Sequence, residues 1–318
     1  MFTALCGDIH NGGNSVVNII ATAESIQQAE ALLEAGVDTL YVGGHPFGLR
    51  LPNALSPEEI GRIAELAHER KRKVTVAVNG LMHNEQIEQL PDYLKQLAKI
   101  KIDAITVGDP GAILLLKEMG LDIPFIYDAQ TLVTSAEQIA FWVKRGAIGA
   151  VAARELTLIE LTEIQNQLDA PIEVQVYGPT CIHQSKRPLV TNYYHYAKLP
   201  ESSDKERGLY LRDPKDAESQ YPIYEDENGT HIFSTEDLSL MPYLDELYKN
   251  NLLTWKLDGV LLSGQPFVEI AALFVKAKEA LEAGSFVPAA FDNQLKDLQP
   301  AARPLGTGFY LKNPDDVK

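Results

Sequence analysis

Residues 174–198, VQVYGPTCIHQSKRPLVTNYYHYAK, gather side chains that can do chemistry. The Cys181 thiol can serve as a nucleophile or a metal ligand, and Lys186 and Arg187 can bind anions. His183 is poorly placed to act as the base of a Cys/His pair. A cysteine mechanism would therefore need a histidine that is more distant in the sequence. Three readings of Cys181 stay open: the nucleophile of a hydrolase, one ligand of a lost metal site, and a small residue at a strand end.

The cations of this stretch are followed by three tyrosines, Tyr193, Tyr194 and Tyr196. Basic residues can contact phosphates while aromatic rings stack on unpaired bases, so the stretch favours anion or base binding over hydrolysis. Half-buried tyrosines packed in a loop would give the same pattern. Elsewhere the sequence contains no nucleophile elbow, phosphate-binding loop, metalloprotease helix or dinucleotide fingerprint.

More polar residues come directly after short β-branched runs, at strand ends. Parallel barrels place their active sites at the carboxyl ends of their strands, so these side chains are expected to meet at one face. Structural roles are open too: Asp109 can cap the next helix, Glu155 can pair with Arg154, and His83 can begin a helix. The candidates are His45, Arg50, Asn79, His83, Asp109, Asp128, Gln130, Arg154 and Glu155, with Cys181, His183, Lys186 and Arg187 after the seventh run.

Strand and helix patterns alternate along the chain and must position these residues. Ser56 and Pro57, for example, are typical of a helix start. Eight such units predict an α/β (β/α)8 TIM-barrel-like fold, with an open doubly wound sheet as the alternative. The predicted strands are residues 18–23, 39–44, 73–80, 104–109, 124–130, 150–155, 172–178 and 255–264.

An insertion separates the seventh and eighth strands, at about residues 179–254. Asn228 and Gly229 lie between two apolar runs, which predicts a β-hairpin. Residues 235–250 are expected to be helical, with Thr235 as the cap. We expect a single domain over residues 1–318, with a barrel core at about 17–284 and a C-terminal tail at 285–318 packed on it.

The formal net charge of −16 argues against a protein that binds nucleic acid without regard to sequence, although it leaves a specific RNA substrate open. The cations of residues 68–73, HERKRK, are typical of a helix C-terminus. Cys6 and Cys181 lack the spacing of a zinc site or a disulfide framework. Since no segment is apolar enough to span a membrane or direct export, we expect a cytoplasmic protein.

Several ordered motifs together resemble peptidase family U32, the collagenase-like proteins, over about residues 17–283. They are FGLRLPNALSPEEI, VTVAVNGLMHNEQIEQLPDYL, AARELTL, VQVYGPTC with QSKR, and YPIYEDENGTHIFSTEDLSL. Within the family the chain is most similar to the cluster-lacking first paralogue of the bacterial tRNA hydroxylation proteins. The resemblance implies a barrel and a part in converting the wobble uridine of tRNA to 5-hydroxyuridine, with prephenate as a small-molecule requirement.

The resemblance also implies tRNA and a cluster-bearing paralogue as partners. Many relatives hold a four-iron four-sulfur cluster with four cysteines, of which Cys181 matches the first, while Pro188 and Ser239 stand at two others. Because one thiolate cannot hold such a cluster, we expect no cofactor or metal bound by this chain. An enzyme subunit is the leading hypothesis, with a collagenase-like peptidase or a non-catalytic scaffold as the alternatives.

Overall fold

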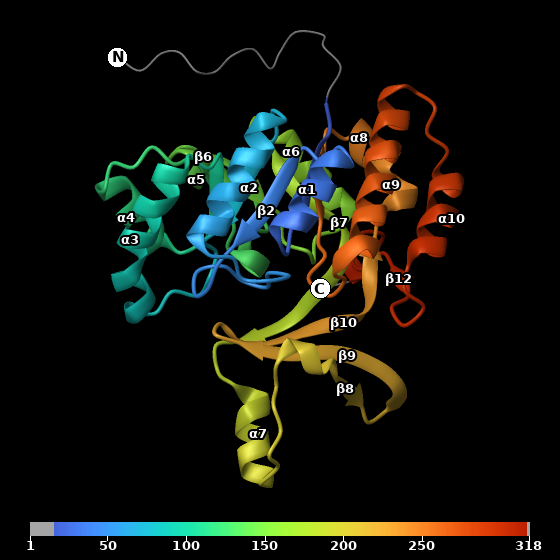
Figure 1. Ribbon diagram of the computed structural model, residues 1–318. Helices are drawn as coiled ribbons and strands as arrows, with labels where there is room; N and C mark the ends of the chain where they lie inside the picture. The colour runs from blue at the N-terminus through green and yellow to red at the C-terminus, as the bar shows by residue number, and fades with distance from the viewer. Residues whose placement is uncertain (1–15, 317–318) are drawn as a thin grey trace.

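A closed ring of eight parallel strands forms the centre of the protein in a computed structural model that describes residues 16–316 (Figure 1). Strands β1 to β7 pair in chain order, and β11 closes the ring by pairing with both β7 and β1. Closure excludes the open doubly wound sheet and confirms the predicted (β/α)8 barrel. The eight strands are β1 (Asn18–Thr22), β2 (Thr39–Gly43), β3 (Lys73–Ala77), β4 (Ala104–Val107), β5 (Phe125–Tyr127), β6 (Ala147–Val151), β7 (Ile172–Ser185) and β11 (Thr254–Leu257).

Helices surround the ring and bury the outward faces of its strands in one large apolar cluster. Helix α2 begins as predicted, since Pro57 is its first residue and Ser56 and Glu59 form a reciprocal capping box around it. The cations at its end pair with acids, as Arg70 does with Glu30. The helices of the ring are α1 (Ile26–Glu34), α2 (Pro57–Glu69), α3 (Asn84–Ile100), α4 (Pro110–Glu118), α5 (Ala136–Val143), α6 (Leu158–Asn166) and α9 (Gly264–Glu282), with the short η1 (Gln130–Leu132) before α5.

The inside of the barrel is polar rather than filled with large aliphatic side chains. Successive side chains of a strand point to opposite faces, so each ring strand sends alternate residues inward. Ile20, Tyr41, Leu51 and Ala77 form a small inner cluster separate from the main core. Buried polar residues accompany this cluster: Thr22, Thr39, Thr75, Thr106, Glu173 and Lys256.

Strand β7 belongs to two sheets. Its first half pairs with β6 and β11 in the barrel, and its second half pairs antiparallel with β10 (Gly229–Ser239). We call residues 179–239 the arm, because they project from one end of the barrel in Figure 1. The arm contains α7 (Leu189–Ala197), η2 (Lys205–Arg207), β8 (Leu209–Asp213) and β9 (Asp216–Asp226) besides β10. The predicted hairpin around Asn228 and Gly229 is confirmed as β9 and β10.

Two predicted elements are corrected. Thr235 is not a helix cap, because β10 continues to Ser239 and pairs with the barrel half of β7. The helical part is confined to η3 (Met241–Tyr243) and α8 (Leu244–Lys249). The sixth strand begins at Ala147, three residues before the predicted 150–155, and ends before Arg154, which therefore lies in the following loop.

The C-terminal segment packs against β10, and Arg303 lies at the centre of this contact. Arg303 donates from Nε to Asp237 Oδ1 at 3.2 Å and from a terminal nitrogen to the Ser234 carbonyl at 2.9 Å. Gln299 donates to the other Asp237 oxygen at 2.9 Å. The elements of this segment are α10 (Pro288–Leu298), β12 (Leu305–Gly306), which pairs with β10, and η4 (Pro314–Asp316). Within residues 16–316, no helix combines the length and apolar character that crossing a membrane requires.

Replacing Gly178 with alanine tests the point at which β7 leaves the barrel. Gly178 has φ +109°, and a β-carbon there would lie 2.1 Å from the Asp258 carbonyl oxygen. We expect Gly178→Ala to lower the free energy of unfolding by about 3 kcal/mol or more, since both the backbone conformation and the contact are unfavourable. Gly284→Ala is the control: φ is +69° and no atom lies within 4 Å, so about 1 kcal/mol is expected. Denaturant unfolding measures both, and equal losses would contradict the role of Gly178.

Candidate functional site

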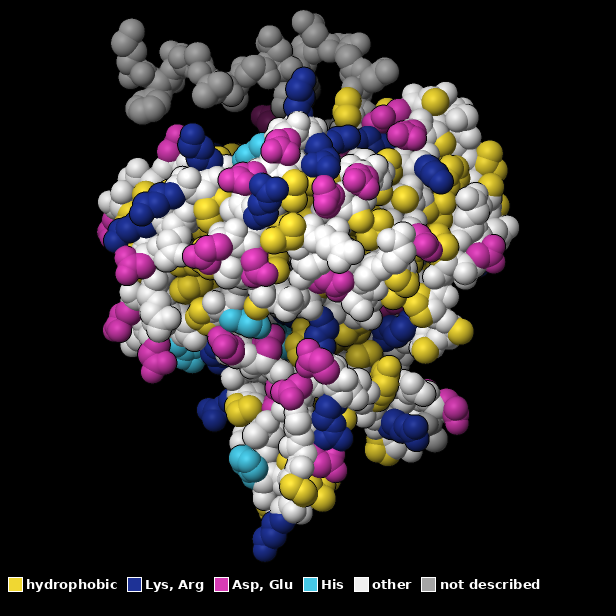
Figure 2. All heavy atoms as spheres, in the orientation of Figure 1, with side chains coloured by type: hydrophobic (Ala, Val, Ile, Leu, Met, Phe, Trp, Pro, Cys, Tyr) yellow, Lys and Arg dark blue, Asp and Glu magenta, His cyan; other side chains and the backbone are white. Residues whose placement is uncertain are grey.

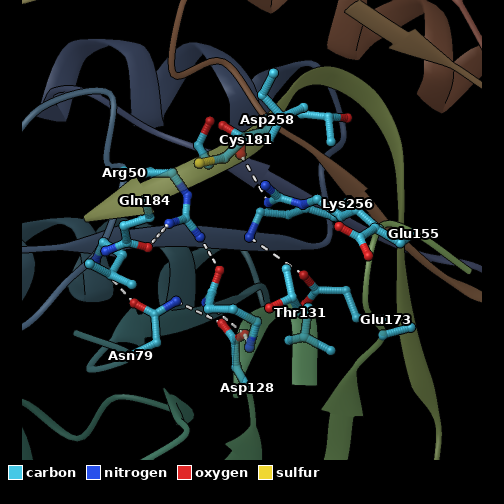
Figure 3. Close-up of a pocket in the computed structure, with 18 of the residues that line it drawn as sticks. Arg50, Asn79, Asp128, Thr131, Glu155, Glu173, Cys181, Gln184, Lys256 and Asp258 are labelled. Atoms are coloured by element: carbon cyan, nitrogen blue, oxygen red, sulfur yellow. Dashed lines mark hydrogen bonds and ion pairs between the residues drawn. The ribbon is translucent and has the colours of Figure 1, made fainter. Parts of the chain in front are cut away.

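A cavity of about 290 Å³ lies where the arm meets the carboxyl ends of the barrel strands (Figure 3). Its walls come from loops after several strands and from the arm half of β7. Acidic, basic and amide side chains converge in it. The polar side chains that line it are Thr22, Tyr41, Arg50, Asn79, Asp128, Gln130, Thr131, Arg154, Glu155, Glu173, Thr180, Cys181, His183, Gln184, Lys256 and Asp258.

Arg50 is fixed by amides from two directions. Its guanidinium donates to Gln184 Oε1 of β7 at 2.6 Å and also to Gln130 Oε1. Gln130 in turn donates to Asp128 Oδ1 at 2.8 Å, and Asn79 donates to Asp128 Oδ2 at 2.6 Å. Because neutral oxygens hold Arg50 directly, its charge is not neutralised by a bonded carboxylate and remains available to an anion.

Arg50 and Gln130 also share an uncommon backbone conformation, with φ of 49° and 57°. Neither closes a helix, unlike Lys101 and Lys198, whose positive φ angles occur at helix C-caps. Non-glycine residues in the left-handed region are uncommon and cluster at functional sites. The two contacting side chains are therefore oriented at some cost in backbone energy.

A buried ion pair lies deeper in the barrel. Lys256 Nζ is 3.6 Å from Glu173 Oε1, and the side chains are 6% and 5% exposed. Lys256 Nζ also lies 3.1 Å from the centroid of the Tyr41 ring, a cation–π contact. Burial lowers the pKa of Lys256 and raises that of Glu173, while each partner's charge opposes the shift.

Arg154 and Asp258 form a looser ion pair at the rim. Their closest nitrogen and oxygen are 3.5 Å apart, at the outer limit of a charge-assisted hydrogen bond. Arg154 is one quarter exposed and Asp258 is buried. A loosely held arginine beside an open volume can turn to a ligand at small cost.

Cys181 has a histidine partner that the sequence analysis did not identify. His231 of β10 is fully buried, and its Nε2 lies 2.9 Å from Asp226 Oδ1. Burial by itself would raise the pKa of the Cys181 thiol, but the nearby His231 and the charges of Arg50 and Arg154 outweigh it and hold the pKa below its ordinary value. Strand β10 thus supplies the distant histidine that the sequence analysis required for a Cys/His pair.

The structure brings eight of the predicted site residues into one cavity and separates the other five. The eight are Arg50, Asn79, Asp128, Gln130, Arg154, Glu155, Cys181 and His183. Asp109 instead caps α4 by accepting from the Ala112 amide at 3.0 Å, and His83 stands at the start of α3. His45 is exposed outside the cavity.

Of the four cations expected at this face, Arg50 and Arg154 line the cavity, whereas Lys186 and Arg187 do not. Lys186 Nζ donates to the Glu227 carbonyl at 2.8 Å, and Arg187 is exposed on the arm. The turn of β7 into the arm carries both side chains past the mouth. Glu155 does not pair with Arg154, whose acidic partner is Asp258.

Sequence reasoning missed the charged residues inside strands because it searched strand ends only. Glu173 and Lys256 each interrupt an apolar run, in IEVQV and TWKL. A single charge at an inward position of a predicted strand was the available signal. Asp258 directly follows β11 and was missed because the predicted strand ran to residue 264. Tyr41 and Gln184 gave no comparable signal, and neither did His231 and Asp226.

The ligand set of a four-iron four-sulfur cluster does not fit these residues. Cys181 faces β10 at Phe233, and Ser239 pairs with Tyr177 at the barrel end of the same strand. Pro188 and Ser239 cannot supply thiolates. Among residues 16–316, no group of three or more His, Cys, Asp or Glu side chains is arranged to hold a metal ion.

Comparisons with known proteins agree on a family. The sequence profile of peptidase family U32 matches residues 24–318. The chain is 34% identical over 301 residues to tRNA hydroxylation protein P2 of Bacillus subtilis, which covers 92% of this chain and 97% of that protein. It is 24% identical over 321 residues to the collagenase of Porphyromonas gingivalis, covering 92% and 73%. A solved U32 peptidase structure superposes with a TM-score of 0.49 at 13% identity, covering 80% of this chain and 97% of that one.

The paralogue number expected from the sequence needs correction. The chain is 26% identical over 275 residues to tRNA hydroxylation protein P1 of Bacillus subtilis, covering 82% of this chain and 63% of that protein. The protein named P2 is thus both more similar and closer in length. The family resemblance is confirmed, and the relative that this chain resembles more is the one numbered second.

Breaking the buried ion pair should destabilise the barrel in a pH-dependent way. Lys256→Met leaves the buried Glu173 carboxylate unpaired, so we expect a loss of about 3–5 kcal/mol near pH 7. A carboxyl group whose folded-state pKa is raised binds more protons when folded, so its charge costs stability as pH rises above the unfolded value of about 4.3. The loss should therefore shrink between about pH 7 and about pH 5.

Denaturant unfolding at the two pH values measures this effect. The control is Lys249→Met, which removes an exposed partner of Asp245 on α8 and should change neither the stability nor its pH dependence measurably. A loss for Lys256→Met that stayed constant over this range would contradict the assignment to Glu173.

Proposed function

The chain belongs to peptidase family U32, and on that premise we propose that it acts in RNA hydroxylation. More specifically, we propose a subunit of the system that converts the wobble uridine of tRNA to 5-hydroxyuridine. Relatives named tRNA hydroxylation proteins support this, the P2 protein of Bacillus subtilis over nearly its full length. So does the relative named 23S rRNA 5-hydroxycytidine C2501 synthase of Escherichia coli, 27% identical over 237 residues, covering 72% of this chain and 34% of that protein.

One observation carries the proposal: the polar cavity, with Arg50 and Arg154 in its lining, opens beside an arm whose outer segment is basic and aromatic. Residues 186–200 contain Lys186, Arg187 and Lys198 and no Asp or Glu, in a chain of net charge −16. Figure 2 shows the arm projecting from the barrel, with a Lys or Arg side chain at its tip. Such a segment suits a phosphate backbone, and the acidic body would discourage contacts elsewhere.

Helix α7 also exposes large aromatic side chains. Tyr196 is 87% exposed and Tyr193 is 59% exposed, so both rings are free to stack. Unpaired bases of an RNA loop can be splayed onto such rings while one base enters a pocket. A wobble base lies in a single-stranded anticodon loop and can reach a recessed cavity without opening a helix.

The cavity cations suit a small carboxylate. Arg50 has no bonded carboxylate, and Arg154 holds Asp258 only loosely. We extend the proposal to prephenate, whose carboxylates these arginines would bind in bidentate geometry. The volume of about 290 Å³ is at the lower end of small-molecule sites.

Hydroxylation replaces a C–H bond by C–OH and therefore needs an oxidant and a source of oxygen. The described side chains offer one thiol and no cluster ligand set. We therefore propose that a cluster-bearing paralogue supplies the redox group as a partner, with this chain binding tRNA and the small carboxylate.

Proteolysis is the second candidate, because Cys181 lies beside a histidine and one relative is named a collagenase. Cleavage of gelatin by the purified protein, abolished by Cys181→Ser, would establish it. A cysteine peptidase must also protonate its leaving amine from the substrate side. His231 does not line the cavity, which weighs against this candidate.

The experiment that tests the function is nucleoside mass spectrometry of tRNA. In a deletion strain without a parallel oxygen-dependent route, complementation should restore wobble 5-hydroxyuridine, and Arg154→Gln should lower it at least about tenfold by removing a charged contact. Arg145→Gln is the control, because Arg145 lies on the barrel exterior over the Phe141 ring. Unchanged modification in the deletion strain would refute the proposal. Normal modification by Arg154→Gln alone would favour a non-catalytic scaffold.

Removing the arm's aromatic rings should weaken tRNA binding. Tyr193→Ala with Tyr196→Ala should raise the Kd for tRNA at least about fivefold, since a stacked base contributes about 1–3 kcal/mol. Phe141→Ala removes an aromatic side chain, 46% exposed, from α5 on the barrel and should leave the Kd unchanged. Filter binding at fixed salt measures all three proteins. Equal affinities would remove α7 from the RNA interface.

A further inference from the structure

The second half of β7 and the hairpin place three groups in sequence behind the cavity wall. Cys181 lines the cavity, His231 lies behind it, and Asp226 lies behind His231. They come from three strands, β7, β10 and β9, that hydrogen-bond side by side. The order of thiol, imidazole and carboxylate is that of an activated cysteine nucleophile.

One ring nitrogen of His231 is bonded to a carboxylate, and the other is available to a second group. Its side chain is 0% exposed, Nε2 is 2.9 Å from Asp226 Oδ1, and Nδ1 has no hydrogen-bond partner among residues 16–316. A buried ring nitrogen without a partner is costly unless it has a use. The Cys181 thiol donates to the His183 carbonyl at 3.2 Å, so pairing with Nδ1 requires the thiol to turn away from that carbonyl.

We infer that Cys181 is a thiolate nucleophile, with His231 as its proton acceptor and Asp226 as the group that orients His231. Its substrate is the electrophilic carbon of a small anionic molecule held in the cavity by Arg50 and Arg154. This inference does not depend on RNA as a substrate, and it assigns a function to Cys181 that goes beyond the proposed function.

Charges from several elements support the thiolate. Arg50 follows β2 and Arg154 follows β6, and both lower the pKa of Cys181, while Tyr224 of β9 and His183 of β7 also lie near the thiol. Burial alone would lower the pKa of His231, but the hydrogen bond to Asp226 and the nearby Cys181 raise it above its ordinary value. Burial likewise opposes ionisation of Asp226, but hydrogen bonding to His231 lowers its pKa and keeps it charged. The three groups therefore favour the thiolate and imidazolium pair.

The step that this arrangement supports is addition. The thiolate sulfur forms a bond to an electrophilic carbon, the π bond of that carbon breaks, and its electron pair moves to the conjugated oxygen, where Arg50 and Arg154 offset the negative charge. The thiol proton stays on His231. Reversal returns the electron pair and the proton, so the step needs no oxidant or reductant.

Acyl transfer is disfavoured by the position of the base. An acyl transfer must deliver a proton to the leaving group on the substrate side. His231 is fully buried behind Cys181 and has no surface on the cavity, so its proton can reach only the sulfur. Addition needs no such delivery.

Alkylation of the single thiol tests the inference. The full chain carrying Cys6→Ser is treated with iodoacetamide across a range of pH, and the rate is read by intact mass. An ordinary thiol is only a few per cent thiolate near pH 7, so we expect Cys181 to react about tenfold faster than in the denatured chain, with its inflection at lower pH. His231→Gln should move the inflection up and remove the rate advantage.

Two further variants separate the chemistry from folding. Asp226→Asn keeps a hydrogen bond to the ring but removes the charge, so it should give an intermediate inflection if thermal melting shows an intact fold. His195→Gln changes an exposed histidine of α7 that is not part of the cavity lining and should leave the inflection in place. An inflection equal to that of the denatured chain, or one moved by His195→Gln and not by His231→Gln, overturns the inference.

A second measurement tests whether the cavity prefers an anionic substrate. Iodoacetate is the charged analogue of iodoacetamide, so the ratio of their rates should be higher in the folded chain than in the denatured one. Arg154→Gln should lower that ratio without abolishing the reaction with iodoacetamide. A ratio that is the same in folded and denatured protein would refute the assignment of an anionic substrate.

Discussion

The architecture depends on one constraint, that β7 is shared by two sheets. A strand that closes a barrel would ordinarily end at the mouth, but β7 continues from Tyr177 through Gly178 into the arm. Its direction there is set by contact with the backbone of Asp258, which only a residue without a β-carbon permits. The position of every arm residue over the mouth, including Cys181 and Gln184, follows from this continuity.

The polar interior of the barrel is the second feature on which the site depends. Charged side chains that point inward need charged or polar partners because they are removed from water. Lys256 finds it in Glu173 and in the Tyr41 ring, whereas Arg50 finds only amide oxygens. The deep charge of Lys256 therefore has a carboxylate partner, whereas Arg50 is bonded to amide oxygens, and this difference favours the mouth over the bottom of the barrel for the proposed anion.

The arm covers the mouth of the barrel and forms the wall of the cavity that contains Cys181. Asn228 donates to the Gly48 carbonyl at 3.0 Å, and Lys205 donates to the Pro52 carbonyl at 2.7 Å, so the hairpin is tied to the loop after β2. These ties hold His231 and Asp226 behind Cys181. The same segment presents α7 outward, so one insertion shapes the cavity and provides the surface proposed for RNA.

The sequence by itself determined the alternation of strands and helices, the hairpin and the start of α2, because these depend on local patterns such as the Ser56 box and the turn at Asn228 and Gly229. Whether the strands close into a barrel was decided by the pairing of β11 with β7 and β1, and the cap predicted at Thr235 was overruled by the pairing of β10 with β7. It also identified residues at strand ends, such as Arg50 and Asp128, since parallel strands bring their carboxyl ends together whatever their partners. Only the tertiary structure decided that Lys186 leaves the mouth and that His231 meets Cys181, 50 residues earlier in the chain. Contacts of this kind depend on strand register and on the path of β7, which no local pattern encodes.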